Sequence, residues 1–427
     1  MSHLVFLEST PLGNHALAYA RDKGHRTTLL RSAQYDFFLT PEVRTRAVSL
    51  ADQVVEVDDL SDVDAVRQAM QSADVPPFDA VLTVVQFCVT SAAHLARACG
   101  VRGPSPTAVE AAKDKSRCRQ ILDEHAIPNL RHFVVTSCGE ALEAADALGY
   151  PVVIKPVSGT GKLVTTMARG ERDITLHFAE VAARRDALEP ALTDDIGENF
   201  IVEEVAVGPL YSVEVATDGR STVPLAAIRR KVGRDNPLLE LGSTMPTGLP
   251  GPEEDELGAY CVRVCQALGL DLGIFHVEAI RTAEGFRLIE VNPRIGGGMV
   301  PDVIRAATDT NLFEILVDLY AGSPAPARPL AVGRGATNYF LGVERPRTVR
   351  ADLPEDWFEG FRPRLEFGSS TIRAGMQLRA MEGNLDRYGT LQVTAQDSEQ
   401  AERDCADIAA AMESVLGIDF VATAPRP

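Results

Sequence analysis

The residues whose types and spacing could do chemistry are concentrated in residues 275–294, FHVEAIRTAEGFRLIEVNPR. This stretch alternates like two strands joined by a short turn, which predicts a hairpin with a three-residue loop and Gly285 in the left-handed conformation. In that register Glu278 lies opposite Glu290, and Asn292 projects from the same face as Glu290. Two like charges about 5 Å apart destabilise a bare hairpin, whereas two carboxylates and an amide oxygen suit Mg²⁺. The spacing therefore predicts a magnesium site, with a solvated acidic hairpin as the alternative.

A glycine-rich loop, VSGTGKL at residues 157–163, could bind phosphate. It follows a predicted strand, but it lacks the first glycine and the final hydroxyl residue of a P-loop. A short loop of this kind can still close over a triphosphate with its backbone N–H groups and one lysine. A mobile turn between strands is the competing interpretation.

Charged residues in other segments could contact a nucleotide. Lys155 interrupts the apolar strand VVIKP, where a buried ammonium is costly unless it meets an anion such as phosphate. Lys115 lies on a predicted helix, where a lysine by itself is usually solvated. Glu203 and Glu204 end a predicted strand and point to opposite sides, so one could bind adenine or ribose while the backbone of Val205 reads the adenine edge. Two glutamates at a strand edge are equally well explained as surface residues.

Composition limits the class of protein. A chain of 427 residues suggests two to four domains. Its formal net charge of −18 argues against nucleic acid and anionic membrane as partners, because both need concentrated Lys and Arg. The seven cysteines are scattered without the histidines of a zinc set, so we expect them to be small core residues. The sequence shows no signal segment and no apolar run of membrane-spanning length, which predicts a cytoplasmic protein.

The elements that must position the candidate residues fall into three units. Apolar strands alternate with helical stretches through residues 1–105, which is typical of an open parallel sheet; the GxGxxG fingerprint of dinucleotide binding is missing. After a break at residues 103–106, the unit 106–325 mixes helices and antiparallel strands and contains all the candidate residues. A Pro-rich linker at residues 321–329 leads into a smaller α+β unit, residues 326–427. Single helices are expected over about residues 107–125 and 299–319.

Taken in order, the lysine of DKS, the strand VVIKP, the glycine loop, VEE, YSVE and a hairpin closing on EVNPR resemble the ATP-grasp superfamily. The resemblance covers about residues 104–324. It implies a central domain of two α+β subdomains that hold ATP between them. A preceding open parallel-sheet (pre-ATP-grasp) domain and a following small α+β domain complete the expected fold class, which is α/β and α+β.

The resemblance also implies a role for each matching residue. Lys115 and Lys155 would contact the phosphates of ATP, and Arg294 would face the transferred phosphate. The other residues would form the flap over the phosphates (Ser158, Gly159, Gly161 and Lys162), hold the adenine side (Glu203, Glu204 and Val205) and bind Mg²⁺, or Mn²⁺ in its place (Glu278, Glu290 and Asn292). Relatives often carry an acid that holds the ribose where this chain has Leu210, so ribose binding would fall to Glu203 or Glu204, or be looser.

Within the superfamily, GPSPTAVEAAKDKS, LELGS at residues 239–243 and NPRIGGG are most similar to the amino-acid ligase branch. The segment after Asn292 lacks the runs that biotin carboxylases and D-alanine ligases carry there. The branch implies an amino-acid pocket lined by the loop of Glu240 and by residues 294–298. Gly297 is the middle one of three glycines that would let backbone N–H groups approach an acyl phosphate closely.

The implied activity is that of an ADP-forming carboxylate–amine ligase that makes dipeptides or related amides, often in specialised-metabolite pathways. A carboxylate would attack the γ-phosphate of ATP, and an amine would then displace phosphate from the acyl phosphate. Lys155 and Arg294 would balance the developing charge. The alternatives are an ATP-grasp ligase for a carboxylate that is not an amino acid, and a nucleotide-binding scaffold that has lost turnover. Amino acids are the expected partners, and a homodimer is implied by the resemblance only.

Two further features of the sequence, a histidine and a basic run, could also belong to the site. His276 pairs with Asn292 in the predicted register and is expected to support the site rather than to act as a base. The basic run Arg229–Lys231 could attract a substrate carboxylate, or it could be an exposed basic turn.

Overall fold

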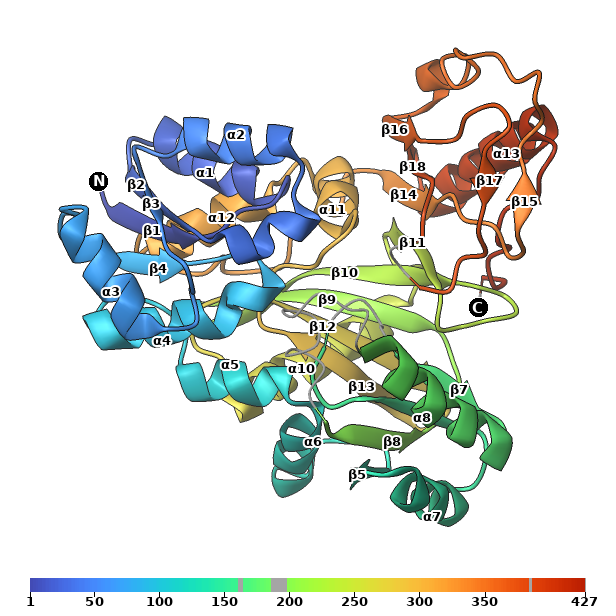
Figure 1. The fold of residues 1–427 in the computed structure, drawn as a ribbon, viewed down its shortest axis with the longest axis horizontal. Coiled ribbons are helices and arrows are strands. Elements are labelled where there is room, and N and C mark those ends of the chain that lie inside the picture. The colour runs from blue at the N-terminus through green and yellow to red at the C-terminus, as the bar shows by residue number, and fades with distance from the viewer. Residues whose placement is uncertain (160–163, 186–197, 384–385, 427) are drawn as a thin grey trace.

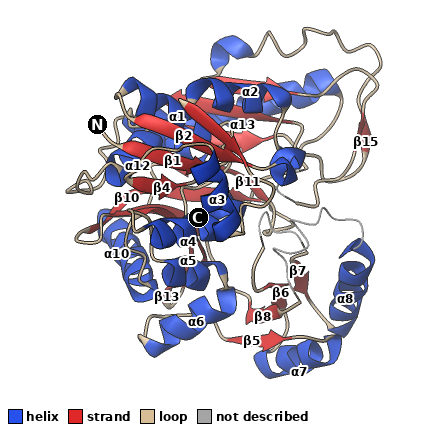
Figure 2. Ribbon diagram, turned by 60° about the vertical axis from the view of Figure 1, so that its left-hand side comes forward, coloured by secondary structure: helices blue, strands red, loops and turns tan. Residues whose placement is uncertain are grey.

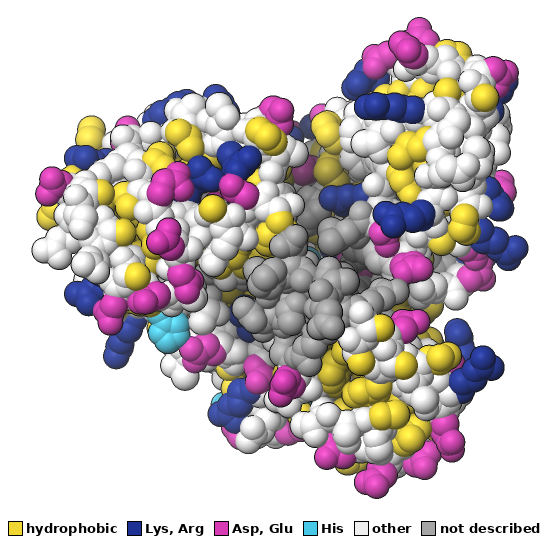
Figure 3. Space-filling model, in the orientation of Figure 1, with side chains coloured by type: hydrophobic (Ala, Val, Ile, Leu, Met, Phe, Trp, Pro, Cys, Tyr) yellow, Lys and Arg dark blue, Asp and Glu magenta, His cyan; other side chains and the backbone are white. Residues whose placement is uncertain are grey.

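The computed structural model describes residues 1–159, 164–185, 198–383 and 386–426. Figure 1 shows three lobes around a set of long central strands: an N-terminal sheet with its helices, a small sheet with two helices, and a C-terminal lobe. The predicted fold class, α/β with α+β units, is confirmed. Asp and Glu side chains are scattered over all three lobes (Figure 3), as expected from the net charge of −18.

An open parallel sheet forms the N-terminal lobe, as predicted. Its strands, in spatial order, are β3 (Gln53–Glu56), β2 (Arg26–Arg31), β1 (His3–Leu7) and β4 (Ala80–Leu82). Its faces are covered by α1 (Gly13–Asp22) and α2 (Pro41–Leu50) on one side, and by α3 (Val63–Ser72) and α4 (Val89–Cys99) on the other. Leu4 and Phe6 enter the first core and Val5 and Leu7 the second. Because both faces are buried, the strands β1 and β4 are almost wholly apolar, whereas β2 and β3 carry polar residues as well.

The stretch 107–125, predicted as one helix, is two helices. They are α5 (Pro106–Lys113) and α6 (Lys115–Glu124). Between them Asp114 has an extended backbone, and its side chain accepts hydrogen bonds from the N–H groups of Ser116 and Arg117. Asp114 is therefore the N-cap of α6. The hydrophobic pattern runs through the break, so the pattern alone could not reveal it.

The stretch 299–319 is also two helices rather than one. They are α11 (Val300–Thr308) and α12 (Leu312–Tyr320), separated at Asp309, which has a left-handed backbone with φ of 54°. α12 packs against α1, and the Tyr19 hydroxyl donates to Asp318 Oδ2 at 3.1 Å. This contact joins the N-terminal lobe to the central part of the chain.

The small lobe is an antiparallel sheet covered on one face. Its strand order is β5 (His132–Val135), β8 (Phe200–Glu204), β6 (Val152–Pro156) and β7 (Thr166–Ala168). Figure 2 shows the two covering helices, α7 (Cys138–Leu148) and α8 (Glu171–Arg185), on the outer side. Ile154 and Val202 point into the core beneath them. The neighbouring residues Lys155 and Glu203 therefore point the other way, towards the central strands.

The central strands belong to an eight-stranded antiparallel sheet. Its order is β13 (Gly285–Asn292), β12 (Gly273–Thr282), β9 (Leu210–Thr217), β10 (Thr222–Val232), β11 (Glu240–Met245), β14 (Gly335–Phe340), β18 (Gly389–Ala395) and β16 (Phe367–Ser370). The helices α5, α6 and α10 (Gly251–Leu268) cover one face of its first strands, where Tyr211, Val213 and Val215 are buried. The opposite face carries the candidate residues.

The C-terminal lobe is an extension of this sheet. β14 pairs with β11 through Thr337 opposite Thr244, and α13 (Ser398–Leu416) packs on β14 and β18. The lobe also contains the paired strands β15 (Arg347–Thr348) and β17 (Gln377–Leu378). The sheet thus crosses the predicted boundary at residues 325 and 326, and that boundary stays a prediction. Short 3-10 helices are formed by Ala33–Phe38, Gln86–Cys88 and Arg362–Arg364.

Two expectations from composition can be compared with this structure. The seven cysteines are free thiols, and five of them are buried, as expected for core residues. Among the described residues, no helix has both the length and the apolar character needed to cross a membrane.

Candidate nucleotide and metal site

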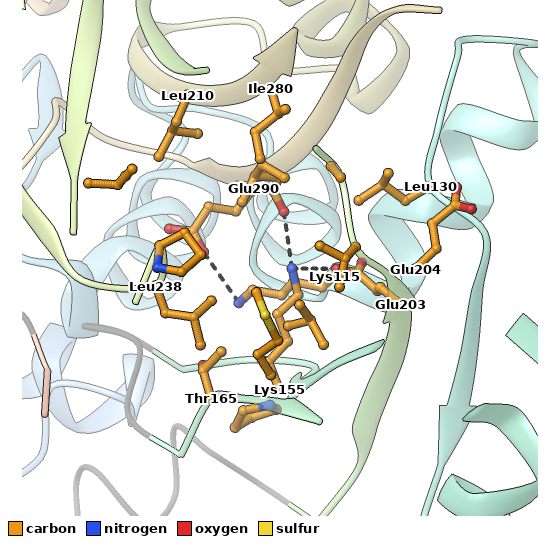
Figure 4. A pocket seen from close by; sticks show the side chains of 18 of the residues that line it. Lys115, Leu130, Lys155, Thr165, Glu203, Glu204, Leu210, Leu238, Ile280 and Glu290 are labelled. Carbon is orange, nitrogen blue, oxygen red and sulfur yellow. Dashed lines mark hydrogen bonds and ion pairs between the residues drawn. The ribbon is translucent and has the colours of Figure 1, made fainter. Parts of the chain in front are cut away.

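A pocket lies between the small sheet and the large sheet (Figure 4). Leu210, Val232 and Ile280 supply apolar walls from the large sheet. Eight predicted site residues line it: Lys115, Lys155, Ser158, Gly159, Glu203, Glu204, Val205 and Glu290. The predicted flap residues Gly161 and Lys162 lie outside the described residues. An apolar slot with lysines at one end matches the shape and charge of a nucleotide, whose flat base is joined to phosphates.

Lys155 belongs to a buried group of three charges at the base of this pocket. Its Nζ lies 2.7 Å from Glu203 Oε2, and Arg119 Nε lies 2.8 Å from Glu203 Oε1. Burial lowers the pKa of Lys155, with Glu203 opposing the shift. For Glu203 burial favours the neutral acid, but Arg119 and Lys155 outweigh it and hold the pKa at about 2. The carboxylate is therefore ionised and occupied by two cations, which leaves one surplus positive charge for an anion.

Glu204 points away from that group. Its Oε2 lies 2.7 Å from Arg131 Nε, and its Oε1 accepts from the backbone N–H of Arg131 at 2.9 Å. Its side chain is 29 % exposed. The two adjacent glutamates thus point to opposite sides of β8, as predicted, and each already has a basic partner.

Lys115 reaches the pocket because of the helix break at Asp114. It is the first residue of α6, and its backbone N–H donates to the carbonyl of Val157 at 2.8 Å. This bond ties the helix to the end of β6, next to the start of the glycine loop. The Lys115 ammonium lies 3.7 Å from Glu290 Oε2, on the opposite wall of the pocket (Figure 4). The two predicted phosphate lysines, Lys115 and Lys155, are therefore brought together.

The register predicted for the hairpin is confirmed at the site and wrong at the turn. β12 and β13 pair Glu278 with Glu290, so the two carboxylates lie opposite each other. Thr282 pairs with Gly285, so the loop between them has two residues rather than the predicted three. The error cancels because a β-bulge further along the ladder restores the predicted pairing.

The bulge supplies an acceptor that the sequence did not suggest. The ladder steps from Leu288 to Glu290, which leaves Ile289 as the extra residue. Ile289 and Glu290 both line the pocket although they are neighbours in a strand. The Ile289 carbonyl accepts from the guanidinium of Arg119 at 3.0 Å and from Lys155 Nζ at 3.4 Å. The bulge therefore fixes the two buried cations against the hairpin.

The predicted metal ligands have oxygen atoms that suit a cation. Glu278 is 4 % exposed, and its Oε2 has no hydrogen-bond partner among the described residues. Asn292 Nδ2 donates to Glu290 Oε1 at 3.0 Å. A buried carboxylate oxygen without a partner is costly, and a cation would remove that cost. Within the described chain no group of three or more His, Cys, Asp or Glu side chains forms a complete metal site. A divalent ion would thus need these two carboxylates, the amide oxygen and nucleotide phosphates, a ligand set typical of Mg²⁺.

A buried network holds Glu278 in place. His276 Nε2 lies 3.2 Å from Glu278 Oε1, and His276 Nδ1 lies 2.5 Å from Glu214 Oε1. Burial disfavours the imidazolium, but the two carboxylates raise the pKa of His276 to about 9. Glu214 Oε2 accepts from the Gly296 N–H at 3.1 Å. The histidine is therefore a support for the site, in agreement with the expectation, and it also reaches the glycine segment.

Arg294 and Gly297 follow directly after the hairpin. Arg294 donates to the carbonyl of Ile295 at 2.6 Å. Burial lowers the pKa of Arg294, while Glu214, Glu290 and Glu278 oppose that shift. The charge of Arg294 therefore interacts with the two predicted carboxylate ligands, Glu278 and Glu290. A Cβ at Gly297 would lie 3.7 Å from the Arg294 guanidinium, so the predicted glycine segment and the arginine are close neighbours.

Glu240 is placed beside the same group of charges. It is 5 % exposed and forms an ion pair with Arg230 from the neighbouring strand β10. Arg230 is also attracted by Glu278 and Glu214, which raises its pKa against the effect of burial. Only one member of the basic run 229–231 therefore faces the candidate site. Arg229 and Lys231 point to the opposite face of the sheet.

Three supporting residues were missed in the sequence. Arg119 is 1 % exposed and stands four residues after Lys115 on α6, where a charged helix position is ordinarily read as surface. Glu214 ends the YSVE motif, and its pairing with His276 across β9 and β12 depends on strand order. Ile289 is an apolar residue whose carbonyl matters, so side-chain chemistry gave no signal for it.

Parts of this chain are similar to known proteins. Residues 148–302 match the family model described as ATP-grasp domain. Carnosine synthase 1 of Gallus gallus is 29 % identical over 287 residues, which cover 64 % of this chain and 31 % of that protein. The L-arginine-specific L-amino acid ligase of Bacillus subtilis is 24 % identical over 319 residues, which cover 72 % of this chain and 73 % of that one. The chain thus contains an ATP-grasp domain.

The whole fold is also found among solved structures. The L-amino acid ligase of Bacillus licheniformis superposes with a TM-score of 0.74 at 18 % sequence identity, covering 96 % of this chain and 97 % of that chain. This similarity extends over the N-terminal and C-terminal lobes as well as the ATP-grasp domain. At this identity it establishes the fold alone. The alignments with carnosine synthase 1 span only about a third of those proteins.

Proposed function

We propose that this protein is an ATP-dependent carboxylate–amine ligase that joins amino acids through an acyl phosphate and releases ADP and phosphate. The observation that carries the proposal is that two lysines that could bind phosphate lie near a pair of carboxylates. One oxygen of that pair is buried and has no hydrogen-bond partner among the described residues. Lys115, Lys155 and Glu290 line the pocket, and Glu278 lies opposite Glu290 in the hairpin. The similarity to amino-acid ligases supports the choice of substrate class.

The chemistry follows from which groups are pre-positioned. Lys155 and Lys115 would hold the phosphates of ATP, since both ammonium groups lie on the pocket walls. Mg²⁺, held by Glu278, Glu290 and Asn292, would neutralise phosphate charge when bound. Arg294 would face the transferred phosphate and the carboxylate that receives it, because a guanidinium can bind carboxylate or phosphoryl oxygens in two-point fashion. Catalysis of this type is mostly positioning and charge stabilisation.

The substrate end of the site is proposed to lie beyond Arg294. Glu240 with Arg230 and the glycine segment 296–298 surround that end. The C-terminal lobe adds Arg387, whose guanidinium lies 4.5 Å from the Phe340 ring centroid and would come within 4.0 Å of a Cβ at Gly298. These groups supply positive and negative charges, which would pair with the carboxylate and the ammonium group of a free amino acid.

Leu210 is the observation that favours the alternative of an inactive nucleotide-binding scaffold. It is 6 % exposed and lines the pocket where an acid could hold a ribose. The retained carboxylates, Arg294 and the buried lysine favour an enzyme instead, because a pure binder has little need of a charge-balanced phosphoryl site.

The test is Mg²⁺-dependent release of ADP and phosphate from ATP, screened over single and paired amino acids, with mass spectrometry of the products. Release that requires two amino acids and yields their summed mass minus water is the expected result. Glu290→Gln should lower kcat by about 10²-fold or more, by analogy with removal of an electrostatic catalytic group. Glu284→Gln, in the exposed turn of the same hairpin, is the matched control and should leave kcat unchanged.

Three outcomes separate the candidates. Turnover with another carboxylate, and none with amino acids, would point to a ligase of different substrate class. ATP binding without turnover on any carboxylate and amine tested would point to the scaffold. Full activity of Glu290→Gln would contradict the metal site itself.

A further inference from the structure

A second pocket lies on the opposite face of the large sheet from the candidate site. Side chains alternate along β10, so Arg230 meets Glu240, whereas Arg229 and Lys231 point to the other face. There they line a pocket of about 480 Å³ between β10, α13 and residues 420–426. Arg229 contacts Glu402 of α13, as does the Thr244 hydroxyl of β11, which confirms the side on which these residues lie.

Basic side chains outnumber acidic ones in this pocket. Four basic residues, Arg229, Lys231, Arg403 and Arg426, line it together with two acidic residues, Glu402 and Glu413. Both carboxylates are already engaged. Glu402 accepts from Arg229 and from Thr244 and lies 3.9 Å from Arg426, and Glu413 accepts from the backbone N–H of Phe420 at 2.7 Å. Arg403 and Arg426 also pair with Glu399, which lies outside the lining, at 3.7 and 3.2 Å. The surplus positive charge of the pocket therefore lies at Lys231.

Two of its donors have no acceptor in the described part of the chain. Arg229 is 6 % exposed, and its buried Nε–H has no hydrogen-bond partner there. The Lys231 side chain is half-buried and makes no hydrogen bond or ion pair with any described residue. Desolvation lowers the pKa of its ammonium, against weaker attraction from Cys405 and Glu402. A buried donor such as Arg229 Nε is almost always satisfied in folded proteins, whereas the half-buried Lys231 ammonium is open to the pocket. The two side chains line one pocket, so an anion there could pair with the Lys231 ammonium beside the charge of the Arg229 guanidinium.

The remaining walls are apolar and fixed. Phe420, Tyr339 and Ala409 line the pocket, and the Tyr339 hydroxyl donates to the carbonyl of Val421 at 2.5 Å. The C-terminal segment is tied to β10 by the Ala424 N–H, which donates to the Val232 carbonyl at 2.8 Å. Preformed walls reduce the ordering cost of binding. An apolar wall beside two cations suits an amphipathic anion better than a bare phosphate.

We propose that this pocket binds a small organic carboxylate. Its charged group would meet the Lys231 ammonium, beside the charge of Arg229, and its apolar body would lie against Phe420 and Tyr339. The site is separate from the nucleotide pocket, because β10 and its neighbours lie between them. It therefore does not depend on the proposed ligase activity.

The proposal can be tested by ¹⁹F NMR with 4-fluorophenylacetate as the probe and 4-fluorophenylacetamide as its neutral counterpart, added to the full chain with saturating ATP and Mg²⁺. The carboxylate should bind about tenfold more tightly than the amide, because the charge-assisted hydrogen bonds are lost with the amide. Lys231→Met should weaken binding of the carboxylate about tenfold and leave the amide unaffected. Lys23→Met, at the exposed C-cap position that follows α1, is the control and should change neither.

Ala406→Leu provides a second variant that alters no charge. Ala406 is an exposed position of α13 that lines the pocket, so leucine should be tolerated by the helix while filling the space. Loss of carboxylate binding in this variant, with an unchanged circular dichroism spectrum, would support the site even if Lys231→Met fails to fold. Equal binding of acid and amide, undiminished binding in both variants, or no binding of the acid at millimolar concentration would overturn the proposal.

Discussion

Arg119 connects the small sheet to the hairpin without lining the nucleotide pocket. Its Nε binds Glu203, which also holds Lys155, and its terminal nitrogen binds the Ile289 carbonyl. Any change at Arg119 therefore reaches the predicted phosphate lysine through one carboxylate.

We expect Arg119→Met to lower the free energy of unfolding by about 3–5 kcal/mol, because it leaves Glu203 in a buried site with one of its two cations removed. Urea unfolding followed by circular dichroism measures the change. Arg117→Met is the matched control on the same helix, since its side chain is 47 % exposed, and it should stay within about 0.5 kcal/mol of the wild type. A loss below 1 kcal/mol for Arg119→Met would show that the buried group of charges is dispensable (threshold set by typical surface changes).

The ionisation of Glu203 gives stability a defined pH dependence. Its pKa falls from 4.5 to about 2 in the folded state, so its contribution is fully present above pH 4.5 and is lost as pH falls towards 2. The difference in unfolding free energy between the wild type and Glu203→Gln should therefore shrink by about 1 kcal/mol between pH 6 and pH 4. Denaturant unfolding at the two pH values measures it. A difference that stays constant or grows towards acid pH would contradict the low pKa.

The glycine segment offers a paired test of close packing. A Cβ at Gly296 would lie 2.6 Å from Glu214 Oε1 and 2.7 Å from His276 Nδ1, whereas the nearest atom to a Cβ at Gly297 is 3.7 Å away. Gly296→Ala should thus destabilise the fold by about 1–3 kcal/mol, and Gly297→Ala by less than about 0.5 kcal/mol. Thermal unfolding of both variants measures the contrast. Equal melting temperatures would argue against the Glu214–His276 network.

At the scale of elements, the β-bulge determines where the hairpin presents its acceptor. Deleting Ile289 would let Leu288 and Glu290 become consecutive in a regular ladder, so the pairing of Glu278 with Glu290 would be kept. The carbonyl that binds Arg119 and Lys155 would be lost. We expect the deletion variant to fold and to bind ATP about tenfold or more weakly, since each hydrogen bond to a charged donor contributes roughly 1.5–3 kcal/mol. Isothermal titration calorimetry measures the affinity of the deletion variant for ATP. An affinity equal to that of the wild type would show that the bulge has no role in nucleotide binding.

At the scale of the whole molecule, the continuous sheet joins units that the sequence separates. β11 and β14 pair across the predicted boundary, and the core beneath α13 includes Leu239 and Leu241 from before that boundary. A chain ending at residue 325 would expose an unpaired edge strand and part of that core. We expect it to be insoluble, and co-expression with residues 326–427 should restore solubility because β14 can pair again with β11. Sedimentation of the lysate measures both, and a soluble, monomeric 1–325 fragment would favour independent domains.

The sequence alone determined the features that depend on local pattern. Alternation and turn residues predicted the parallel sheet of the N-terminal lobe and the position of Glu278 opposite Glu290, because side chains in strands have a period of two. Lys155 stood out because a charge in an apolar strand requires a partner. Helix breaks at Asp114 and Asp309 were missed, since each depends on a backbone conformation that the hydrophobic period does not encode.

Only the tertiary structure decided what those residues meet. Strand order brings Glu214 to His276, the bulge turns the Ile289 carbonyl towards Arg119, and the face of β10 separates Arg230 from Lys231. The sequence pattern did not predict that the central sheet extends into the C-terminal lobe, because the pairing of β11 with β14 joins segments about ninety residues apart. Contacts between residues distant in sequence follow from packing the whole chain at once, and no local pattern specifies them.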